Sequence, residues 1–540
     1  MNKTLLASLI AMACANAHAI GPFTPLTASA TSANTSENTN PFKLPAGWVQ
    51  TEIVDVNAMN ALFGGAYPAT FRAWDMLDIG GANHQFLYIP HEVQQGAGVT
   101  RFNRDTGVAT ILMQGNNTGI FDSDPASWDQ NNDDFGAFDP AVLSPWNTLL
   151  AGEEWAGNGR LFEMLNPETA TGLGDAQWRW LSSIPSVSHE GLKFDKHGNL
   201  YFIDEDNSGS IYKFVPKTAG DLSVGQTFVL KVTAYNGQAN QNYNHASNTG
   251  NRTGAATWVA ITDADGNKTT TANPFNFTSR GGRAAADEVQ GTPYGRPEDL
   301  IFGTLANGNQ ALYVATTSEQ AVYSIELNDN GTDAIVREFA KGGATKNSAG
   351  NVVPAGSQSG YGLGSPDNLA IDADGNIFIN EDQNPGDVWM ATDADKDGVA
   401  EKMDMFMSLG PFGSEPTGFI ADPRGGFLVN IQHPASNNDA LWSIRPDGDG
   451  DGIADNADNC SEDANANQRD SNNDGYGNVC DADLNNDGSV NQADAGIFRG
   501  AFGSTNADAD LNGDGIVNQV DNGIFRSLFG AQPGPSGVAH

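Results

Sequence analysis

Acidic residues recur at the ends of short apolar segments throughout the first 445 residues of this chain. The segment at 188–216 shows the arrangement: two near-alternating apolar runs are separated by an Asp-Lys-His-Gly-Asn turn, with acids before the first run and after the second. Carboxylates brought together from several strand ends could hold a cluster of hard cations such as calcium. The candidate ligands are Glu153, Glu154, Glu190, Asp204, Glu205, Glu298, Asp367, Glu381 and Asp382.

A single arginine stands out beside these acids. Arg296 precedes the candidate ligand Glu298 by two residues. A guanidinium group binds phosphoryl oxygens with two parallel hydrogen bonds, so Arg296 is a candidate phosphate ligand next to a metal site.

The same segment pattern returns at 365–392 and at 415–444, each with an apolar run, a turn containing Asp and Gly, and a second apolar run. Repeated multi-stranded units without helical periodicity predict an all-β protein, a β-propeller of five or six blades. A β-sandwich is the alternative, but it does not explain why acids recur past the same strand of successive units.

The charge and the termini limit the possible partners. The chain of 540 residues has a formal net charge of −39, which disfavours binding to nucleic acid. The excess of acids fits metal-binding loops better than a halophilic surface, although the two are compatible. Residues 1–19 read as a signal peptide with an Ala-His-Ala cleavage site, and no later run is long enough to cross a membrane. We therefore predict a secreted protein, extracellular or periplasmic.

The composition changes sharply after residue 445. Aspartates alternate with glycines from Asp447 to Asp455, which is the spacing a chain needs to curl around a calcium ion. Once the signal peptide is removed, Cys460 and Cys480 are the remaining cysteines, and they predict one disulfide. The stretch from Asp447 to Asp481 resembles thrombospondin type 3 repeats, in which this disulfide ties neighbouring turns together. Its candidate ligands are Asp447, Asp449, Asp451 and Asp455.

Two further loops carry calcium-ligand spacing at positions 1, 3, 5, 7, 9 and 12 with glycine at position 6. Each runs into a near-identical apolar segment that predicts a short helix. This duplicated unit is similar to a type I dockerin, which implies a cohesin-like or cell-surface partner; a calcium-stabilised spacer is the alternative. The candidate ligands are Asp483, Asn485, Asp487, Ser489, Asn491 and Asp494 in the first loop, and Asp510, Asn512, Asp514, Ile516, Asn518 and Asp521 in the second.

The propeller region resembles the PhoX family of alkaline phosphatases over roughly residues 80–445. The resemblance implies a secreted, calcium- and iron-dependent phosphomonoesterase with a small phosphoester substrate, in which Arg296 binds phosphate and Glu298 binds metal. It is carried by six segments in the family's order, at 144–154, 188–195, 201–216, 295–300, 365–382 and 415–434.

The chain departs from the family pattern at one ligand position. The family has a cysteine, an iron ligand, directly before the Glu-Glu pair, whereas this chain has Gly152. We therefore predict several calcium ions and an altered metal site; iron is not assigned, and its binding stays open as an alternative. Two alternatives remain open: a non-catalytic, calcium-stabilised propeller for adhesion or matrix assembly, and a related calcium-dependent hydrolase of lactonase or phytase type.

These patterns predict six parts along the chain. They are a signal peptide (1–19), a disordered linker (20–45), a PhoX-like propeller (46–445), thrombospondin type 3 repeats (446–481), a dockerin-like module (482–530) and a tail (531–540).

Overall fold

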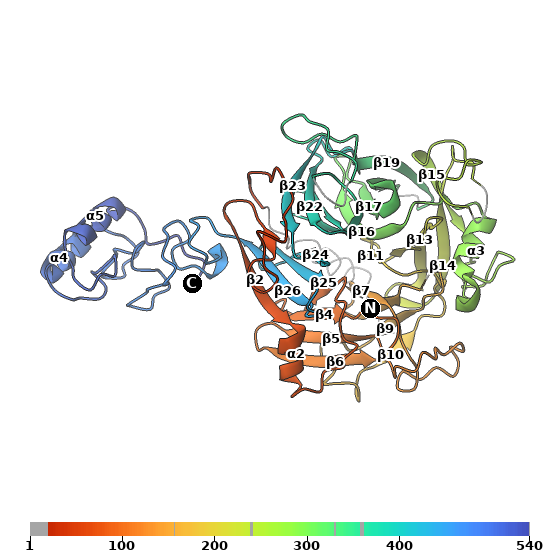
Figure 1. The fold of residues 1–540 in the computed structure, drawn as a ribbon, viewed down its shortest axis with the longest axis horizontal. Helices are drawn as coiled ribbons and strands as arrows, with labels where there is room; N and C mark the ends of the chain where they lie inside the picture. The colour runs from red at the N-terminus through yellow and green to blue at the C-terminus, as the bar shows by residue number, and fades with distance from the viewer. Residues whose placement is uncertain (1–19, 156, 238–240, 329–330, 357–360, 539–540) are drawn as a thin grey trace.

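The structure, a computed structural model, describes residues 20–155, 157–237, 241–328, 331–356 and 361–538. The predicted signal peptide lies outside the described residues. Antiparallel sheets surround a central axis as the six blades of a β-propeller, and the C-terminal region extends away from one side (Figure 1). The all-β propeller predicted from the sequence is confirmed, with six blades.

Each blade is built on four antiparallel strands, to which β1 adds a fifth in the fifth blade. The first strand in sequence lies innermost in the first five blades, and β24 lies innermost in the sixth. The strands of the first three blades are β3 (Asp78–Gly80), β4 (Phe86–Pro90), β5 (Gly98–Asn103) and β6 (Val108–Gln114); β7 (Phe138–Leu143), β8 (Leu149–Glu153), β9 (Leu161–Met164) and β10 (Trp178–Trp180); and β11 (Leu192–Phe194), β12 (Leu200–Ile203), β13 (Ile211–Thr218) and β14 (Asp221–Val232). Those of the last three are β16 (Pro297–Thr304), β17 (Gln310–Thr316), β18 (Ala321–Leu327) and β19 (Asp333–Lys341); β20 (Pro366–Ile371), β21 (Ile377–Glu381), β22 (Gly386–Thr392) and β23 (Lys402–Leu409); and β24 (Glu415–Ala421), β25 (Phe427–Gln432), β26 (Ala440–Pro446) and β2 (Trp48–Asp55).

The last blade closes the ring because its outer strand comes from the start of the chain. Strand β2 pairs with β26 in antiparallel register from Trp48 opposite Pro446 to Asp55 opposite Ala440. Between the third and fourth blades, β15 (Gly254–Ala260) pairs with both β14 and β19 and joins these blades into one nine-stranded sheet. The segment between β14 and β15 therefore lies over the junction of two blades.

Apolar side chains from neighbouring blades form the core. Between the fifth and sixth blades, for example, the buried Phe378, Phe406 and Phe427 pack with ring centroids 4.6 to 5.7 Å apart. Offset and edge-on aromatic pairs of this kind add to the stabilisation from area burial. Contacts of this kind link the fifth and sixth blades to each other.

Residues 20–45 differ from the disordered linker that we predicted. Strand β1 (Phe42–Lys43) pairs with β23, Leu26 bridges to Met405, and the Ala30 amide donates to Ser408 Oγ at 2.7 Å. The sparse apolar residues of this segment suffice because they pack on a preformed sheet edge, which the composition of the segment alone does not reveal.

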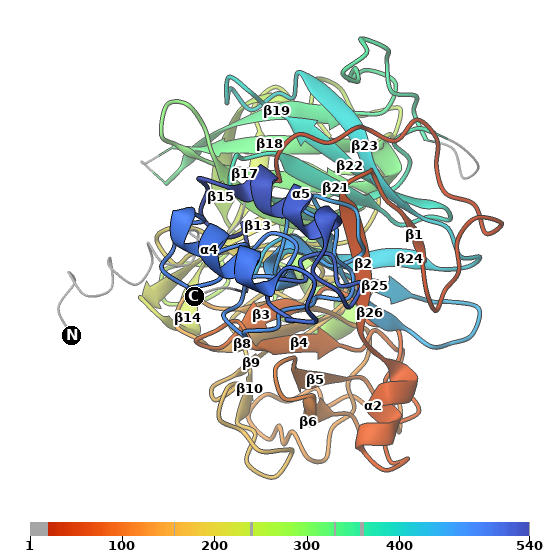
Figure 2. The same ribbon diagram turned by 90° about the vertical axis from the view of Figure 1, so that its left-hand side faces the viewer.

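The C-terminal region contains loops and two short helices, α4 (Gln492–Ala501) and α5 (Gln519–Leu528) (Figure 2). Phe498 stacks on Phe525 with ring centroids 5.0 Å apart, and Cys460 is bonded to Cys480. The predicted tail packs on the loops up to residue 538, since the Gly537 amide donates to the Asp458 carbonyl oxygen at 2.8 Å.

Helices are few elsewhere. They are α2 (Val56–Leu62), α3 (Gly281–Glu288) and the 3-10 turns η1 (Phe277–Ser279) and η2 (Thr317–Glu319); a further 3-10 turn, η3 (Asp455–Ala457), belongs to the C-terminal region. Within the described ranges, no helix has the length and apolar character that a membrane crossing requires.

Candidate metal centre at the mouth of the propeller

One acid stands at or just before the start of the innermost strand of every blade. The innermost strands lie side by side around the axis, so these ends meet at one mouth of the channel. We call these six acids the inner ring; all are buried except the half-buried Glu415. Its members are Asp75, Asp139, Glu190, Glu298, Asp367 and Glu415.

A second set, the outer ring, comes from the chain just past the second strand of four blades, where it returns to the same mouth. Its members are Glu92, Glu154, Glu205 and Asp382. The other two blades have uncharged groups at this place. The Thr317 hydroxyl donates to Glu298 Oε1, and Gln432 Nε2 donates to Glu92 Oε2 at 2.8 Å. The mouth thus contains ten carboxylates.

Three of these carboxylates have the spacing of a metal site. Glu190, Glu205 and Glu298 each offer an oxygen, and these oxygens lie within 4.8 Å of one another. They come from the third and fourth blades. Glu190 and Glu298 are almost fully buried, so their charges are shielded little by water.

The electrostatics of the mouth favour an added cation. Burial, then the neighbouring carboxylates, raise the pKa values of Glu190 and Asp139 well above the usual range. Burial raises the pKa of Glu298 to about 7, against the lowering effects of a hydrogen bond with Glu190 and of the Arg296 charge. Burial and Asp382 raise the pKa of Glu415 to about 11. A cation bound among these carboxylates would stabilise their charged forms.

The donor set fits a hard cation. Within the described part of the chain, the buried oxygens Glu190 Oε2 and Asp139 Oδ1 accept no hydrogen bond. All charged donors of the rings are carboxylate oxygens, the ligands that calcium prefers. The acids of the mouth could therefore hold metal ions.

The donor set does not fit an iron–thiolate site. Gly152 offers no side-chain ligand, and a Cβ atom placed there would lie 2.8 Å from His189 Cβ and 3.2 Å from Pro140 Cγ. Even an alanine would thus require a shift of its neighbours. Gly152 therefore leaves this position without a thiolate ligand for iron.

Arg296 lies on the rim of this mouth. Its guanidinium pairs with Glu205 and lies 3.5 Å from Glu298 Oε1, and its side chain is 38% exposed. Its backbone is in the left-handed region, with φ at 52°, and its amide donates to the Asp206 carbonyl oxygen at 2.9 Å. These contacts hold the arginine beside the three-carboxylate cluster while leaving part of it open to solvent.

Three predicted ligands lie elsewhere. Glu153 accepts from Arg160 Nε at 2.7 Å, Asp204 accepts from Arg283 Nε at 2.6 Å, and Glu381 accepts from Trp389 Nε1 at 3.2 Å. Each directly precedes an outer-ring acid. Because successive side chains of a strand point to opposite faces, only the second acid of each pair reaches the mouth. We leave these three out of the proposed metal site.

The other six predicted residues of the propeller cluster do meet at the mouth. Four further members of the rings were not predicted from the sequence: Asp75, Glu92, Asp139 and Glu415. One regularity points to Asp139. In three blades the inner and outer acids are 15 residues apart, at 139 and 154, 190 and 205, and 367 and 382.

The C-terminal loops fold as their spacing predicts. The first ligand position of each dockerin-like loop, Asp483 or Asp510, is buried and accepts backbone amides from its own loop, including that of Gly488 or Gly515. Asp447, Asp449 and Asp451 offer oxygens within 4.8 Å of one another. These loops could each hold a cation.

The fold and the mouth together define a β-propeller with a carboxylate metal centre. Residues 179–435 match the family model of alkaline phosphatase PhoX, and residues 446–468 and 469–495 match the thrombospondin type 3 repeat. The resemblances to PhoX and to thrombospondin type 3 repeats that the sequence predicted are therefore confirmed over these residues. The second repeat match extends through the first dockerin-like loop. The PhoX match supports a phosphatase.

One solved structure agrees with this fold at a TM-score above 0.5. Pseudomonas fluorescens PhoX in complex with vanadate, a transition state analogue, aligns with a TM-score of 0.53 and 14% identity over 80% of this chain and 98% of that chain. A luciferin-regenerating enzyme aligns with a TM-score of 0.38 and 10% identity, covering 74% of this chain and 95% of its own. Regucalcin, a calcium-binding protein from Agrobacterium tumefaciens, aligns with a TM-score of 0.33 and 11% identity over 69% and 90%. No curated protein sequence matches the chain.

Proposed function

We propose that the chain is a secreted, calcium-dependent phosphatase that hydrolyses phosphomonoesters at the mouth of its propeller. The observation that carries this proposal is the position of Arg296, which lies on the rim beside the carboxylates of Glu205 and Glu298. A phosphate group placed there meets a guanidinium on one side and a site for cations on the other.

The residues of the chain have separate roles in this proposal. Glu190, Glu205 and Glu298 hold calcium, and Thr317 orients Glu298 through its hydroxyl hydrogen bond. When bound, calcium neutralises phosphoryl oxygens and activates the attacking nucleophile. Arg296 exchanges its pairing with Glu205 for the phosphoryl oxygens and stabilises the charge that develops on them. The two rings, which surround the axis, offer room for several calcium ions.

The C-terminal region supports a location outside the cell. Calcium loops and a disulfide are stable in an oxidising, calcium-rich compartment. In this proposal, the dockerin-like module binds a cohesin-like or cell-surface partner and keeps the propeller near its substrate. The predicted signal peptide is consistent with this export.

Replacement of Arg296 tests the catalytic proposal. Arg296→Ala removes the phosphate ligand, and we expect kcat/KM for an aryl phosphate to fall about 100-fold, the loss typical of one charge-stabilising donor. The matched control is Arg179→Ala, because Arg179 is similarly exposed at 34% and also pairs with two acids, away from the mouth. Equal activities of the two variants would refute the role of Arg296.

Gly152 favours a second candidate, a non-catalytic propeller that uses bound calcium only for stability. This alternative predicts bound calcium without turnover of any phosphoester. Calcium analysis of the wild-type protein together with an activity assay separates the two.

A further inference from the structure

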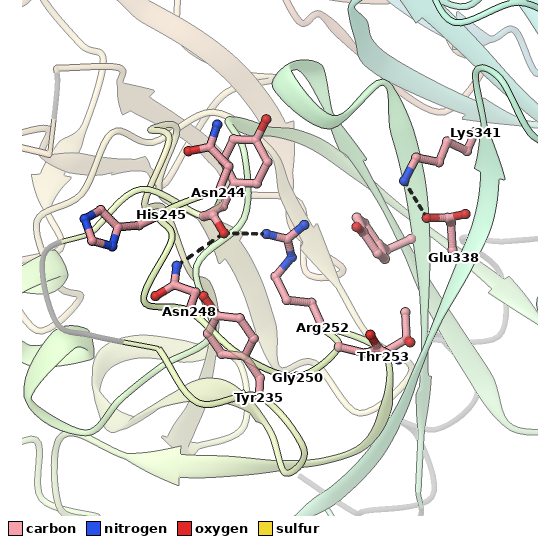
Figure 3. A pocket seen from close by; sticks show the side chains of 12 residues that line it. Tyr235, Asn244, His245, Asn248, Gly250, Arg252, Thr253, Glu338 and Lys341 are labelled. Atoms are coloured by element: carbon pink, nitrogen blue, oxygen red, sulfur yellow. Dashed lines mark hydrogen bonds and ion pairs between the residues drawn. The ribbon is translucent and has the colours of Figure 1, made fainter.

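A cavity of about 350 Å³ lies where the segment between β14 and β15 meets the fourth blade (Figure 3). Tyr235, Tyr243 and Tyr323 line it together with polar side chains. The polar lining includes Asn244, Asn248, Arg252, Thr253, Glu338 and Lys341.

The segment that covers this cavity is held against the rim of the mouth. Tyr243 donates its hydroxyl to the Ser318 carbonyl oxygen at 2.9 Å and its amide to the Asn207 carbonyl oxygen at 2.7 Å. Arg252 pairs with Glu319, which also accepts the Gly295 amide at 2.8 Å. Gly295 directly precedes Arg296, so the cavity wall and the proposed phosphate ligand are parts of one hydrogen-bonded unit.

The strand order gives the direction from the mouth to the cavity. Arg296 precedes the innermost strand β16, whereas Tyr323 is on β18 and Lys341 on β19, two and three strands further out. Strands are about 4.8 Å apart, so the cavity lies roughly 10 to 14 Å outward from the phosphate position. A substrate that reaches it must be longer than one ring.

The charges of the cavity are already balanced. Arg252 pairs with Glu319, and Lys341 pairs with Glu338 at 2.8 Å. The cavity therefore does not present a free cation for a second phosphate. In contrast, among the described residues the buried atoms Tyr235 OH and Arg252 Nε have no hydrogen-bond partner. Aromatic surfaces with unused polar atoms suit an uncharged, polar ring system.

We propose that this cavity binds the organic part of the phosphoester, an uncharged group of nucleoside size, while the phosphate lies at Arg296. This inference rests on the proposed phosphatase activity and adds its substrate class. The cavity thus makes the enzyme selective for nucleoside monophosphates over small phosphoesters.

The test compares adenosine 5′-monophosphate with phenyl phosphate and glucose 6-phosphate, which are too short to fill the cavity. Thr253→Trp narrows the cavity, and we expect it to raise the KM for adenosine 5′-monophosphate about 10-fold while both short substrates change less than twofold. Thr249→Trp is the matched control, because Thr249 is an exposed residue of the same segment outside the cavity lining. Equal changes for all substrates, or no change, would overturn the proposal.

Two further measurements separate this proposal from the proposed function. Tyr235→Phe removes only the unpartnered hydroxyl, and we expect a smaller, about threefold, rise in KM for adenosine 5′-monophosphate alone. Calorimetric titration of the wild-type chain with adenosine tests the cavity without any hydrolysis. Adenosine binding that Thr253→Trp abolishes would support the cavity even if no phosphoester were hydrolysed. Hydrolysis of phenyl phosphate without adenosine binding would refute the cavity and leave the phosphatase proposal standing.

Discussion

The mouth of the propeller and the C-terminal loops both gather carboxylates, but they assemble them differently. In each C-terminal loop the candidate ligands lie within 12 residues of one another, so that one short loop can surround one ion. The ten acids of the mouth come from six blades spread between Asp75 and Glu415. We therefore expect the fold of the C-terminal loops to depend on bound cations, whereas the rest of the propeller positions the acids of the mouth.

The hydrophobic cores of the two regions also differ, in size. The C-terminal module buries one small cluster around Phe498 and Phe525, while the propeller buries several large ones. Removal of calcium should consequently have unequal effects on the two regions, and the following predictions test that difference.

The largest expected effect is the loss of the C-terminal fold on chelation. A ligand present at 1,000 times its Kd stabilises the native state by about 4 kcal/mol, which a core this small cannot replace. We expect fast hydrogen exchange throughout residues 446–530 after calcium chelation. Tryptophan fluorescence should stay native, because all ten tryptophans lie between Trp48 and Trp442.

A single-site comparison sharpens this prediction. Asp510→Asn removes a buried first ligand and should weaken calcium binding by its loop, whereas Asp508→Asn changes an exposed neighbour and should not. Retention of slow exchange in the chelated wild type would show that the loops fold without cations.

At the mouth, loss of one carboxylate should affect activity and leave the fold intact. Glu298→Gln keeps the shape of the side chain but removes a charged ligand. We expect kcat/KM for an aryl phosphate to fall at least 100-fold, or about 2.7 kcal/mol in transition-state stabilisation. Glu326→Gln is the control, since Glu326 pairs with Arg337 on the outer strands. If Glu298→Gln also lowered the thermal unfolding midpoint, the loss of activity would instead indicate a structural role for Glu298.

The pH dependence of the calcium-free propeller follows from the acids of the mouth. Folding raises the pKa of Glu298 from 4.5 to about 7, so the native state keeps a proton that the unfolded chain has lost between these values. The free energy of unfolding must then fall as the pH rises from about 4.5 to 7. The fall is about 1.4 kcal/mol for each unit by which the pKa of the native state exceeds that of the unfolded chain.

Urea denaturation with chelator, followed by tryptophan fluorescence, measures this slope. Glu298→Gln should flatten it, and saturating calcium should remove it by compensating the carboxylate charges. A calcium-free midpoint that rises with pH over this range would contradict the crowding of carboxylates at the mouth.

The smallest expected effect concerns a helix cap at the end of β2, the outermost strand of the sixth blade. Asp55 caps α2 by accepting the Ala58 amide at 2.6 Å. Asp55→Ala should lower propeller stability by about 1 kcal/mol and leave calcium affinity and activity unchanged. An effect of this variant on the C-terminal loops would show that the two regions unfold together.

Sequence patterns predicted the two regions to different depths. The C-terminal ligands were found because turns and ligands share one short stretch of chain, from Asp447 onward. The blades were found because an apolar run, a turn and a second run recur. Neither pattern reveals side-chain direction. This is why Glu153, Asp204 and Glu381 were included, although their side chains bond to Arg160, to Arg283 of α3 and to Trp389.

Other features depend on contacts between distant residues. Asp75 and Glu415 are isolated acids in the sequence, and only ring closure by β2 and β26 brings their two blades together. The packing of residues 20–45 along β23 likewise depends on a strand almost 400 residues away. The cavity at Tyr235 and Tyr243 is lined by the segment between β14 and β15, whose composition rich in Asn and Gly does not reveal a cavity.

Hydrolysis of an aryl phosphate by the purified protein, assayed with calcium, after chelation and after calcium is restored, tests the central claim most directly. Elemental analysis of the same samples gives the calcium bound per chain. We predict turnover that chelation abolishes and calcium restores, without iron in the protein. Bound calcium with no turnover of any phosphoester would contradict the claim and identify the propeller as a calcium-stabilised scaffold.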